Sequence, residues 1–287
     1  MIFNETFELN NGVKIPKLAL GTWMIDDHIV ADAVKNAIKI GYRHIDTAQA
    51  YGNERGVGEG IRNCGIPREE IFVTSKVAAE NKSYASASAS IDDTIAKMNI
   101  GYIDMMIIHS PQPWMEVNQS ENRYFEENKE VWRALEEALQ DGKVRAIGVS
   151  NFLEEDLESI LDSSKVKPMV NQILAHISNT PLSLIKYCQE RGIVVEAYSP
   201  VAHGEALKNP VITKMAEKYG VTVPQLCIKY DLQLNMVVLP KTANPEHMKS
   251  NAKLDFVISN EDMETLRNIE KLDYGNSSFL PVFGGKL

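Results

Sequence analysis

The stretch Asp104-Met-Met-Ile-Ile-His109 carries a pattern that repeats throughout this chain. Four consecutive apolar residues lie between an aspartate and a histidine, and such a run is typical of a parallel strand covered on both faces. Helical periodicity follows over residues 122–141, where Leu135 and Leu139 fall on one face, and residues 146–149 form a second apolar run. The order of strand, helix and strand predicts a parallel sheet with helices packed against it.

The same alternation extends over the whole chain and gives eight apolar runs, each followed by a helical stretch or a long loop. Because the composition shows no break, we predict an α/β fold in which residues 1–287 form a single (β/α)8 or TIM barrel domain. The expected strands are residues 17–20, 44–46, 71–75, 104–109, 146–149, 169–172, 194–198 and 237–240. The expected helices are residues 29–40, 53–64, 83–98, 122–141, 154–162, 181–191, 209–234 (as two helices) and 260–270.

Two further segments refine this prediction. Asn10-Asn11-Gly12 lies between two short runs and predicts an N-terminal β-hairpin over residues 6–15, because Asn and Gly accept positive φ. The alternative fold, a doubly wound open sheet, requires a glycine-rich phosphate loop between a strand and a helix. Gly56-Val-Gly58-Glu-Gly60 instead lies inside a helical stretch, which favours the barrel.

Composition excludes several classes of function. The 287 residues carry a formal charge of −9, so a general nucleic-acid binder is not expected. We find no signal peptide, and no apolar run approaches the ~20 residues that span a bilayer, so we expect a cytoplasmic protein without a membrane partner. Neither the three cysteines nor the six histidines show ligand spacing, so no metal is expected. We expect a monomer or a weak dimer.

Polar residues follow the ends of the predicted strands. In a barrel of this kind, chemistry takes place where the strands end and the loops to the helices begin. Five of the eight strand ends carry an ionisable or aromatic polar residue, namely Asp46, Lys76, His109, Tyr198 and Lys241. Because these ends meet at one mouth of the barrel, the sequence predicts an active site there.

The inner residues of this set form a plausible proton donor. Tyr51 follows Asp46 by five residues, in the loop that begins there. We expect the Lys76 ammonium to lower the pKa of the Tyr51 phenol, with Asp46 as the counterion of Lys76. His109 can hydrogen-bond a carbonyl oxygen and orient it. The set therefore predicts a general acid beside an electrophilic partner.

Several motifs together resemble the aldo-keto reductases of bacterial type. The matching stretches are Gly41-Tyr-Arg-His-Ile-Asp-Thr-Ala-Gln-Ala-Tyr-Gly-Asn-Glu-Arg-Gly-Val-Gly-Glu-Gly60, Ile71-Phe-Val-Thr-Ser-Lys76, Asp104–His109, Ile147-Gly-Val-Ser-Asn-Phe152, Val170-Asn-Gln172 and Ala197-Tyr-Ser-Pro200. The resemblance implies a barrel that reduces aldehydes and ketones to alcohols with NAD(P)H. It implies that the catalytic residues are Asp46, Tyr51, Lys76 and His109.

The resemblance also implies how the cofactor and substrate are bound. Ser150, Asn151 and Gln172 would hold the nicotinamide carboxamide, and Tyr198 would stack on its ring. The full set implied for NADP(H), and also for NAD(H), is Gly21, Thr22, Asp46, Ser150, Asn151, Gln172, Tyr198, Ser199, Pro200, Val201, Lys241, Thr242, His247 and Asn251. The small carbonyl substrate would contact Trp23, Tyr51, His109, Ser110 and Trp114.

The chain departs from the family pattern at several positions. Ala78 and Ser110 stand where many members have aromatic residues, so we expect a roomy pocket that accepts bulky aldehydes, ketones or α-dicarbonyls. We expect Trp114 to cover part of the gap, carried by a loop over residues 112–124 that has the length of a specificity loop. His247 replaces an arginine, which predicts a relaxed preference for NADPH over NADH.

Two other functions stay open at this point. Lys76 at a strand end could form a Schiff base with a carbonyl, as in an aldolase without a dinucleotide. A cofactor-binding regulatory subunit without turnover is the other alternative, although the complete set of four catalytic residue types argues against it.

Overall fold

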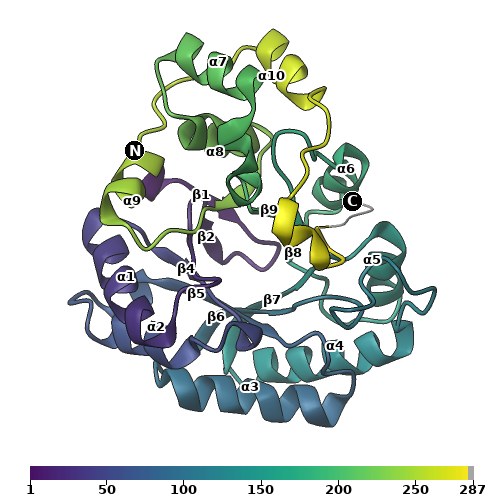
Figure 1. Ribbon diagram of the computed structural model, residues 1–287. Helices are drawn as coiled ribbons and strands as arrows, with labels where there is room; N and C mark the ends of the chain where they lie inside the picture. Colours follow the sequence, from purple (N-terminus) through teal and green to yellow (C-terminus); the bar gives the residue numbers. More distant parts are fainter. Residues whose placement is uncertain (284–287) are drawn as a thin grey trace.

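Eight parallel strands form one sheet in the computed structural model, which describes residues 1–283 (Figure 1). Their order along the sheet is their order along the chain. Two isolated parallel bridges, Leu18 to Val238 and Gly21 to Lys241, join the first strand to the last. The strands are β3 (Leu20–Gly21), β4 (His44–Asp46), β5 (Phe72–Val77), β6 (Ile103–Ile108), β7 (Val144–Ser150), β8 (Val170–Leu174), β9 (Val194–Tyr198) and β10 (Val237–Leu239). The predicted (β/α)8 barrel is confirmed.

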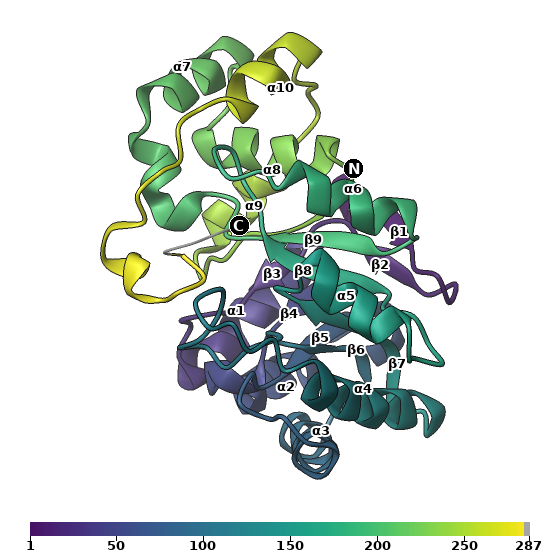
Figure 2. The same cartoon turned by 90° about the vertical axis from the view of Figure 1, so that its right-hand side faces the viewer.

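Helices surround this barrel on its outer side (Figures 1 and 2). They are α1 (Asp27–Ile40), α2 (Glu54–Arg62), α3 (Tyr84–Met98), α4 (Phe125–Gln140), α5 (Glu154–Leu161), α6 (Leu182–Glu190), α7 (Pro210–Tyr219), α8 (Val223–Gln233), α9 (Pro245–Asn251) and α10 (Asn260–Arg267). Gly220 ends α7 with φ of +63°, so the expected pair of helices over residues 209–234 is confirmed. The short helix α9 was not predicted.

The N-terminal hairpin covers one end of the barrel. Its strands β1 (Thr6–Glu8) and β2 (Lys14–Pro16) pair in antiparallel fashion, as predicted. The turn is tied to the barrel because Asn10 and Asn11 donate side-chain hydrogen bonds to the carbonyl oxygens of Pro168 and Arg145. Both acceptors lie at the beginnings of strands, so the hairpin covers the end opposite to the strand ends that carry the polar residues.

The glycines of α2 serve helix packing. A Cβ atom on Gly58 would lie 2.2 Å from the carbonyl oxygen of Met98, and one on Gly56 would lie 2.2 Å from that of Asp27. Helices α1 and α3 can therefore approach α2 closely only because these positions lack side chains. This packing role agrees with the reading that the run from Gly56 to Gly60 is not a phosphate loop.

Candidate active site

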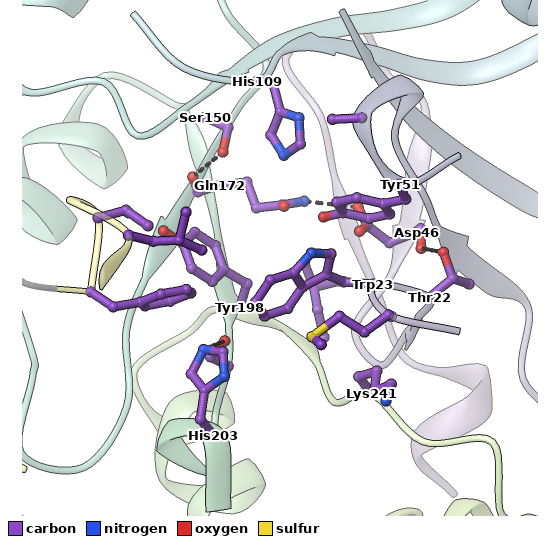
Figure 3. Close-up of a pocket in the computed structure, with 18 of the residues that line it drawn as sticks. Thr22, Trp23, Asp46, Tyr51, His109, Ser150, Gln172, Tyr198, His203 and Lys241 are labelled. Carbon is purple, nitrogen blue, oxygen red and sulfur yellow. Dashed lines mark hydrogen bonds between the residues drawn. The ribbon is translucent and has the colours of Figure 1, made fainter. Parts of the chain in front are cut away.

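A cavity of about 560 Å³ opens among the carboxyl ends of the strands (Figure 3). Asp46, Ser150 and Tyr198 end β4, β7 and β9, and all three line it. The predicted site residues on its wall are Gly21, Thr22, Trp23, Asp46, Tyr51, His109, Trp114, Ser150, Asn151, Gln172, Tyr198, Ser199, Pro200, Val201 and Lys241. The cavity therefore lies at the end of the barrel where the sequence predicted polar residues to gather.

A short 3-10 turn, Gln49–Tyr51, carries Tyr51 over the cavity. The turn ends at Gly52, whose φ of +68° lies in the left-handed region that favours glycine. The Gln49 side chain donates to the carbonyl oxygen of Ser90 and accepts from the backbone N–H of Ala78. The turn is therefore fixed to the neighbouring βα unit, and Tyr51 has a defined position.

Lys76 lies fully buried below the cavity wall and connects the acidic and phenolic groups. Its Nζ donates to Oδ1 of Asp46 at 2.6 Å and to the carbonyl oxygen of Thr47 at 2.8 Å. The same atom lies 3.3 Å from the Oη of Tyr51. The Tyr51 and His109 rings meet edge to face, with centroids 5.6 Å apart. The predicted group of four residues is brought together.

The surroundings of these groups set their protonation. Burial raises the pKa of Tyr51; the nearby Lys76 ammonium lowers it, as expected, but offsets only part of this rise. Burial alone would lower the pKa of Lys76, but Asp46 and Tyr51 outweigh it and the pKa is raised. Burial, and then Lys76, lower the pKa of His109 well below its usual value. At neutral pH the site thus holds a phenol, an ammonium and a neutral imidazole.

A group of amide and hydroxyl side chains faces Tyr51 across the cavity. Ser150 Oγ donates to the carbonyl oxygen of Gln172 at 2.8 Å (Figure 3). Asn151 Nδ2 donates to the carbonyl oxygen of His109 at 3.0 Å, and its Oδ1 accepts from the Tyr198 hydroxyl at 2.6 Å. These contacts tie β7, β8 and β9 together at the cavity wall and hold the side chains in fixed orientations.

Aromatic rings form the remaining wall. The Trp114 ring meets the His109 ring edge to face with centroids 4.6 Å apart, so the loop tryptophan lies beside His109. Trp23 contacts the His203 ring at 5.3 Å, and His203 contacts Phe283 at 4.2 Å between centroids. Trp23, Tyr198 and His203 all line the cavity (Figure 3).

Besides the buried Lys76, four predicted site residues lie outside the cavity. Ser110 is fully buried, and its Oγ accepts the backbone N–H of Gln112, so the expected substrate contact was wrong. Thr242, His247 and Asn251 do not line the cavity either; they lie on the segment that leads from β10 through α9.

The sequence interpretation missed the contribution of the C-terminal segment. Leu280, Val282 and Phe283 line the cavity, together with Met24 and Ala50 and with His203, Gly204 and Leu239. The segment follows the last helix and shows neither periodicity nor a polar motif. Its only signal is the apolar cluster Phe279-Leu-Pro-Val-Phe283 in an otherwise polar region.

Other kinds of site receive no support. Within residues 1–283, no cluster of three His, Cys, Asp or Glu side chains is arranged to hold a metal ion. In the same part of the chain, none of the helices has both the length and the apolar character needed to cross a membrane.

Comparisons with known proteins agree with this geometry. The model of the Aldo/keto reductase family matches residues 17–271. The glyoxal reductase of Bacillus subtilis is 40% identical over 269 residues, which cover 93% of each chain. A crystal structure of an aldo/keto reductase from Brucella melitensis has a TM-score of 0.84 at 35% identity and covers 92% of this chain and 98% of that one. A Bombyx mori aldo-keto reductase in complex with NADP has a TM-score of 0.84 at 31% identity, covering 93% of both.

Proposed function

Because the chain belongs to the aldo/keto reductase family, we propose that it reduces aldehydes and ketones to alcohols with NAD(P)H, using Tyr51 as the proton donor. One observation carries the proposal. The buried Lys76 ammonium contacts Asp46 at 2.6 Å and Tyr51 at 3.3 Å, beside His109, on the floor of a cavity with aromatic walls. This is an acid with a built-in means of stabilising its conjugate base.

Each of the four residues has its own role in the proposed proton transfer. Tyr51 donates its proton to the carbonyl oxygen of the substrate, and the phenolate that remains is stabilised by the Lys76 ammonium. Asp46 keeps Lys76 charged and directed at the phenol. His109 is neutral because its pKa is well below its usual value, and its Nδ1 is buried without a partner among the described residues. Nε2 is therefore the ring nitrogen that we assign to donate a hydrogen bond to the same carbonyl oxygen. The substrate is thereby oriented before the proton moves.

The cavity has the features that a nicotinamide cofactor requires. Ser150, Asn151 and Gln172 line the cavity with hydroxyl and amide groups beside Tyr198, whose ring offers a flat surface. Lys241 lies on the cavity wall, toward the segment that carries His247. When bound, the reduced nicotinamide supplies the hydride for the carbonyl carbon. The chain's own contribution is to position the two reactants and to exclude water.

The wall composition favours neutral substrates with compact or apolar groups. Trp23, Trp114 and Phe283 surround the site beside Tyr51, and Lys241 is the only cation among the described lining residues. A bulky aldehyde or an α-dicarbonyl fits these walls better than a phosphorylated sugar does. The glyoxal reductase with which the chain shares 40% identity acts, by its name, on an α-dicarbonyl.

The two alternative functions are less well supported. A Schiff-base lysine needs a lowered pKa so that its amine is free to attack. Lys76 has a raised pKa and donates to Asp46 and Thr47, so its nitrogen is fully engaged. A regulatory subunit without turnover has no need for the Tyr51–Lys76–Asp46 arrangement.

A steady-state assay tests the proposal. Oxidation of NADPH by the wild-type protein is followed by absorbance with methylglyoxal, glyoxal and benzaldehyde as substrates. Replacement of Tyr51 by Phe is expected to reduce kcat by ~10² to 10⁴-fold, the usual loss on removing one positioned acid. The dissociation constant of NADPH should change less than twofold. A variant that keeps more than a tenth of wild-type kcat would disprove the assignment of the acid.

A further inference from the structure

The amide of Gln172 is held by two carboxyl groups. Its Nε2 donates to Oδ2 of Asp46 at 2.9 Å and to Oε2 of Glu196 at 2.9 Å. Both acceptors belong to other strands, Asp46 to β4 and Glu196 to β9. The amide nitrogen therefore points between the two carboxyl groups, with one N–H directed at each.

This arrangement leaves the amide oxygen free. Oε1 of Gln172 makes no hydrogen bond with the described residues. It is also not among the fully buried polar atoms that lack a partner, and Gln172 lines the cavity. Figure 3 shows the Gln172 side chain extending toward Asp46 among the residues that line the cavity. The oxygen therefore faces the cavity as a single hydrogen-bond acceptor, which suits the N–H group of a carboxamide.

Glu196 has no part in the proton transfer described above. It is fully buried inside the barrel, and its Oε1 has no hydrogen-bond partner within residues 1–283. The nearest charged or titratable groups are Asp46 and His44 on β4 and Lys76 on β5, with the His44 Nε2 at 3.9 Å from Oε1. Strand β10, on the other side of β9, offers only Val237, Val238 and Leu239.

We propose that Glu196 is a positioning residue that, together with Asp46, holds the Gln172 amide so that its oxygen faces the cofactor cavity. The proposal rests on the function proposed above, because it assigns the orientation of one of the groups that would bind the nicotinamide. Asp46 alone fixes one N–H of Gln172 and leaves the other without an acceptor. Glu196 supplies the second contact, and two contacts prevent the rotation that one would allow.

The chemical state of Glu196 determines which variant should replace it. Burial, and then Asp46, raise the pKa of Glu196 to about 8, so the group is mostly a neutral acid at pH 7. Burial lowers the pKa of His44 to about 4 and outweighs the hydrogen bond to the carbonyl oxygen of Pro16, which raises it, so this ring is neutral. A neutral glutamine at position 196 should therefore reproduce the acceptor, whereas a leucine of similar size removes it.

The test measures binding of NADPH at pH 7 by quenching of tryptophan fluorescence. Glu196→Gln should keep the dissociation constant within twofold of wild type. Glu196→Leu should raise it about five- to tenfold, the effect of one lost hydrogen bond. Thr74→Val is the matched control, because Thr74 is buried in the same interior and contacts His44 at 3.0 Å but not Gln172. It should bind NADPH like wild type.

A double-mutant cycle separates positioning from a general structural effect. In a Gln172→Ala background, Glu196→Leu should change the NADPH dissociation constant less than twofold, because there is no amide left to hold. An equal loss in both backgrounds, a wild-type constant for Glu196→Leu, or a Glu196→Gln variant as weak as Glu196→Leu would each overturn the proposal. Failure of wild type itself to bind NADPH would instead reject the proposed function.

Discussion

At the scale of single residues, we expect the preference between NADPH and NADH to depend on His247, a position that does not line the cavity. His247 lies exposed on α9, and its neighbour Lys249 is paired with Glu246 at 2.7 Å. An imidazole cannot offer the two parallel donors with which a guanidinium binds phosphate. We therefore expect both NADPH and NADH to serve as working cofactors.

Replacing His247 by Arg should raise the NADPH/NADH ratio of kcat/KM about tenfold, because one charge-assisted hydrogen bond contributes ~1.5 to 3 kcal/mol. Steady-state kinetics with both cofactors measure this ratio. Asn63→Arg, which adds the same charge at the far end of α2, is the control and should leave the ratio unchanged. An unchanged ratio in the His247 variant, or a wild-type ratio above a thousand, would count against the idea.

Asp231 on α8 is a second residue with a measurable consequence. Its carboxyl is fully buried, and neither oxygen has a partner among the described residues. Burial raises the pKa of Asp231 well above its usual value, so the folded state prefers the neutral acid. The contribution of Asp231 to the free energy of unfolding is therefore fully present below its pKa in the unfolded chain. It is lost as the pH rises through its pKa in the folded protein.

Asp231→Asn should therefore raise the free energy of unfolding at pH 7.5 by about 1–3 kcal/mol, with a smaller gain near pH 4.5. Urea unfolding at the two pH values measures both. Asp262→Asn is the opposite case, because hydrogen bonds from Lys218 and Tyr219 lower the pKa of Asp262. That variant should lose stability at pH 7.5, and a gain in both variants would refute the argument.

At the scale of elements, the loop between β6 and α4 is built around one side chain. Gln112 is fully buried; its Nε2 donates to the carbonyl oxygens of Ser120 and Asn122, and its Oε1 accepts from the N–H of Asn118 and from Arg123. The ends are tied as well, since Lys82 donates to the carbonyl oxygen of Ser110 and Asn128 to that of Pro111. The loop thereby holds Trp114 against His109.

Gln112→Ala should loosen this loop and move Trp114. We expect KM for benzaldehyde and methylglyoxal to rise about fivefold, because the Gln112 hydrogen bonds contribute ~1 kcal/mol to the ordering of the loop. The NADPH dissociation constant should stay within twofold of wild type. Gln119→Ala, an exposed position in the same loop, is the control. Equal effects of the two variants would show that Gln112 does not organise the loop.

The elements also show how far sequence patterns extend. The barrel follows from apolar strands, and the polar strand ends Asp46 and His109 could be located because both sit at fixed places in that pattern. The seven-residue helix α9 was missed, since it is too short for periodicity and depends on a cap from Asn244 and on Pro245. The cavity wall made by Phe283 depends on a tertiary contact across the molecule, which no local pattern encodes.

At the scale of the whole molecule, two hydrophobic clusters meet. The larger fills the barrel and its inner helix faces, and the smaller lies among α7, α8 and α10 (Figure 2). Leu234 and Phe256 pack against both clusters. The two are further joined where the Gln233 side chain donates to the carbonyl oxygen of Ile258 and accepts its N–H. We therefore propose that the chain folds as one domain.

A single domain should unfold in one cooperative transition. Urea denaturation followed by tryptophan fluorescence and by circular dichroism measures this, because the three tryptophans, at positions 23, 114 and 132, all lie outside the smaller cluster. Coincident curves are expected. A fluorescence transition displaced from the circular dichroism transition would show that α7, α8 and α10 unfold separately.

The Gln112-centred loop has a consequence for how such an enzyme changes over evolutionary time. Its polar contacts close on the loop itself, on two anchors at its ends and on Asp156 of α5, which pairs with Arg123. Lys76 lies on β5 and Tyr51 on a separate 3-10 turn. We therefore expect that the loop carrying Trp114 can be replaced by another loop without disturbing the proposed proton donor. Different loops between the same two anchors would then change which substrates are accepted, while the proposed reduction itself stays the same.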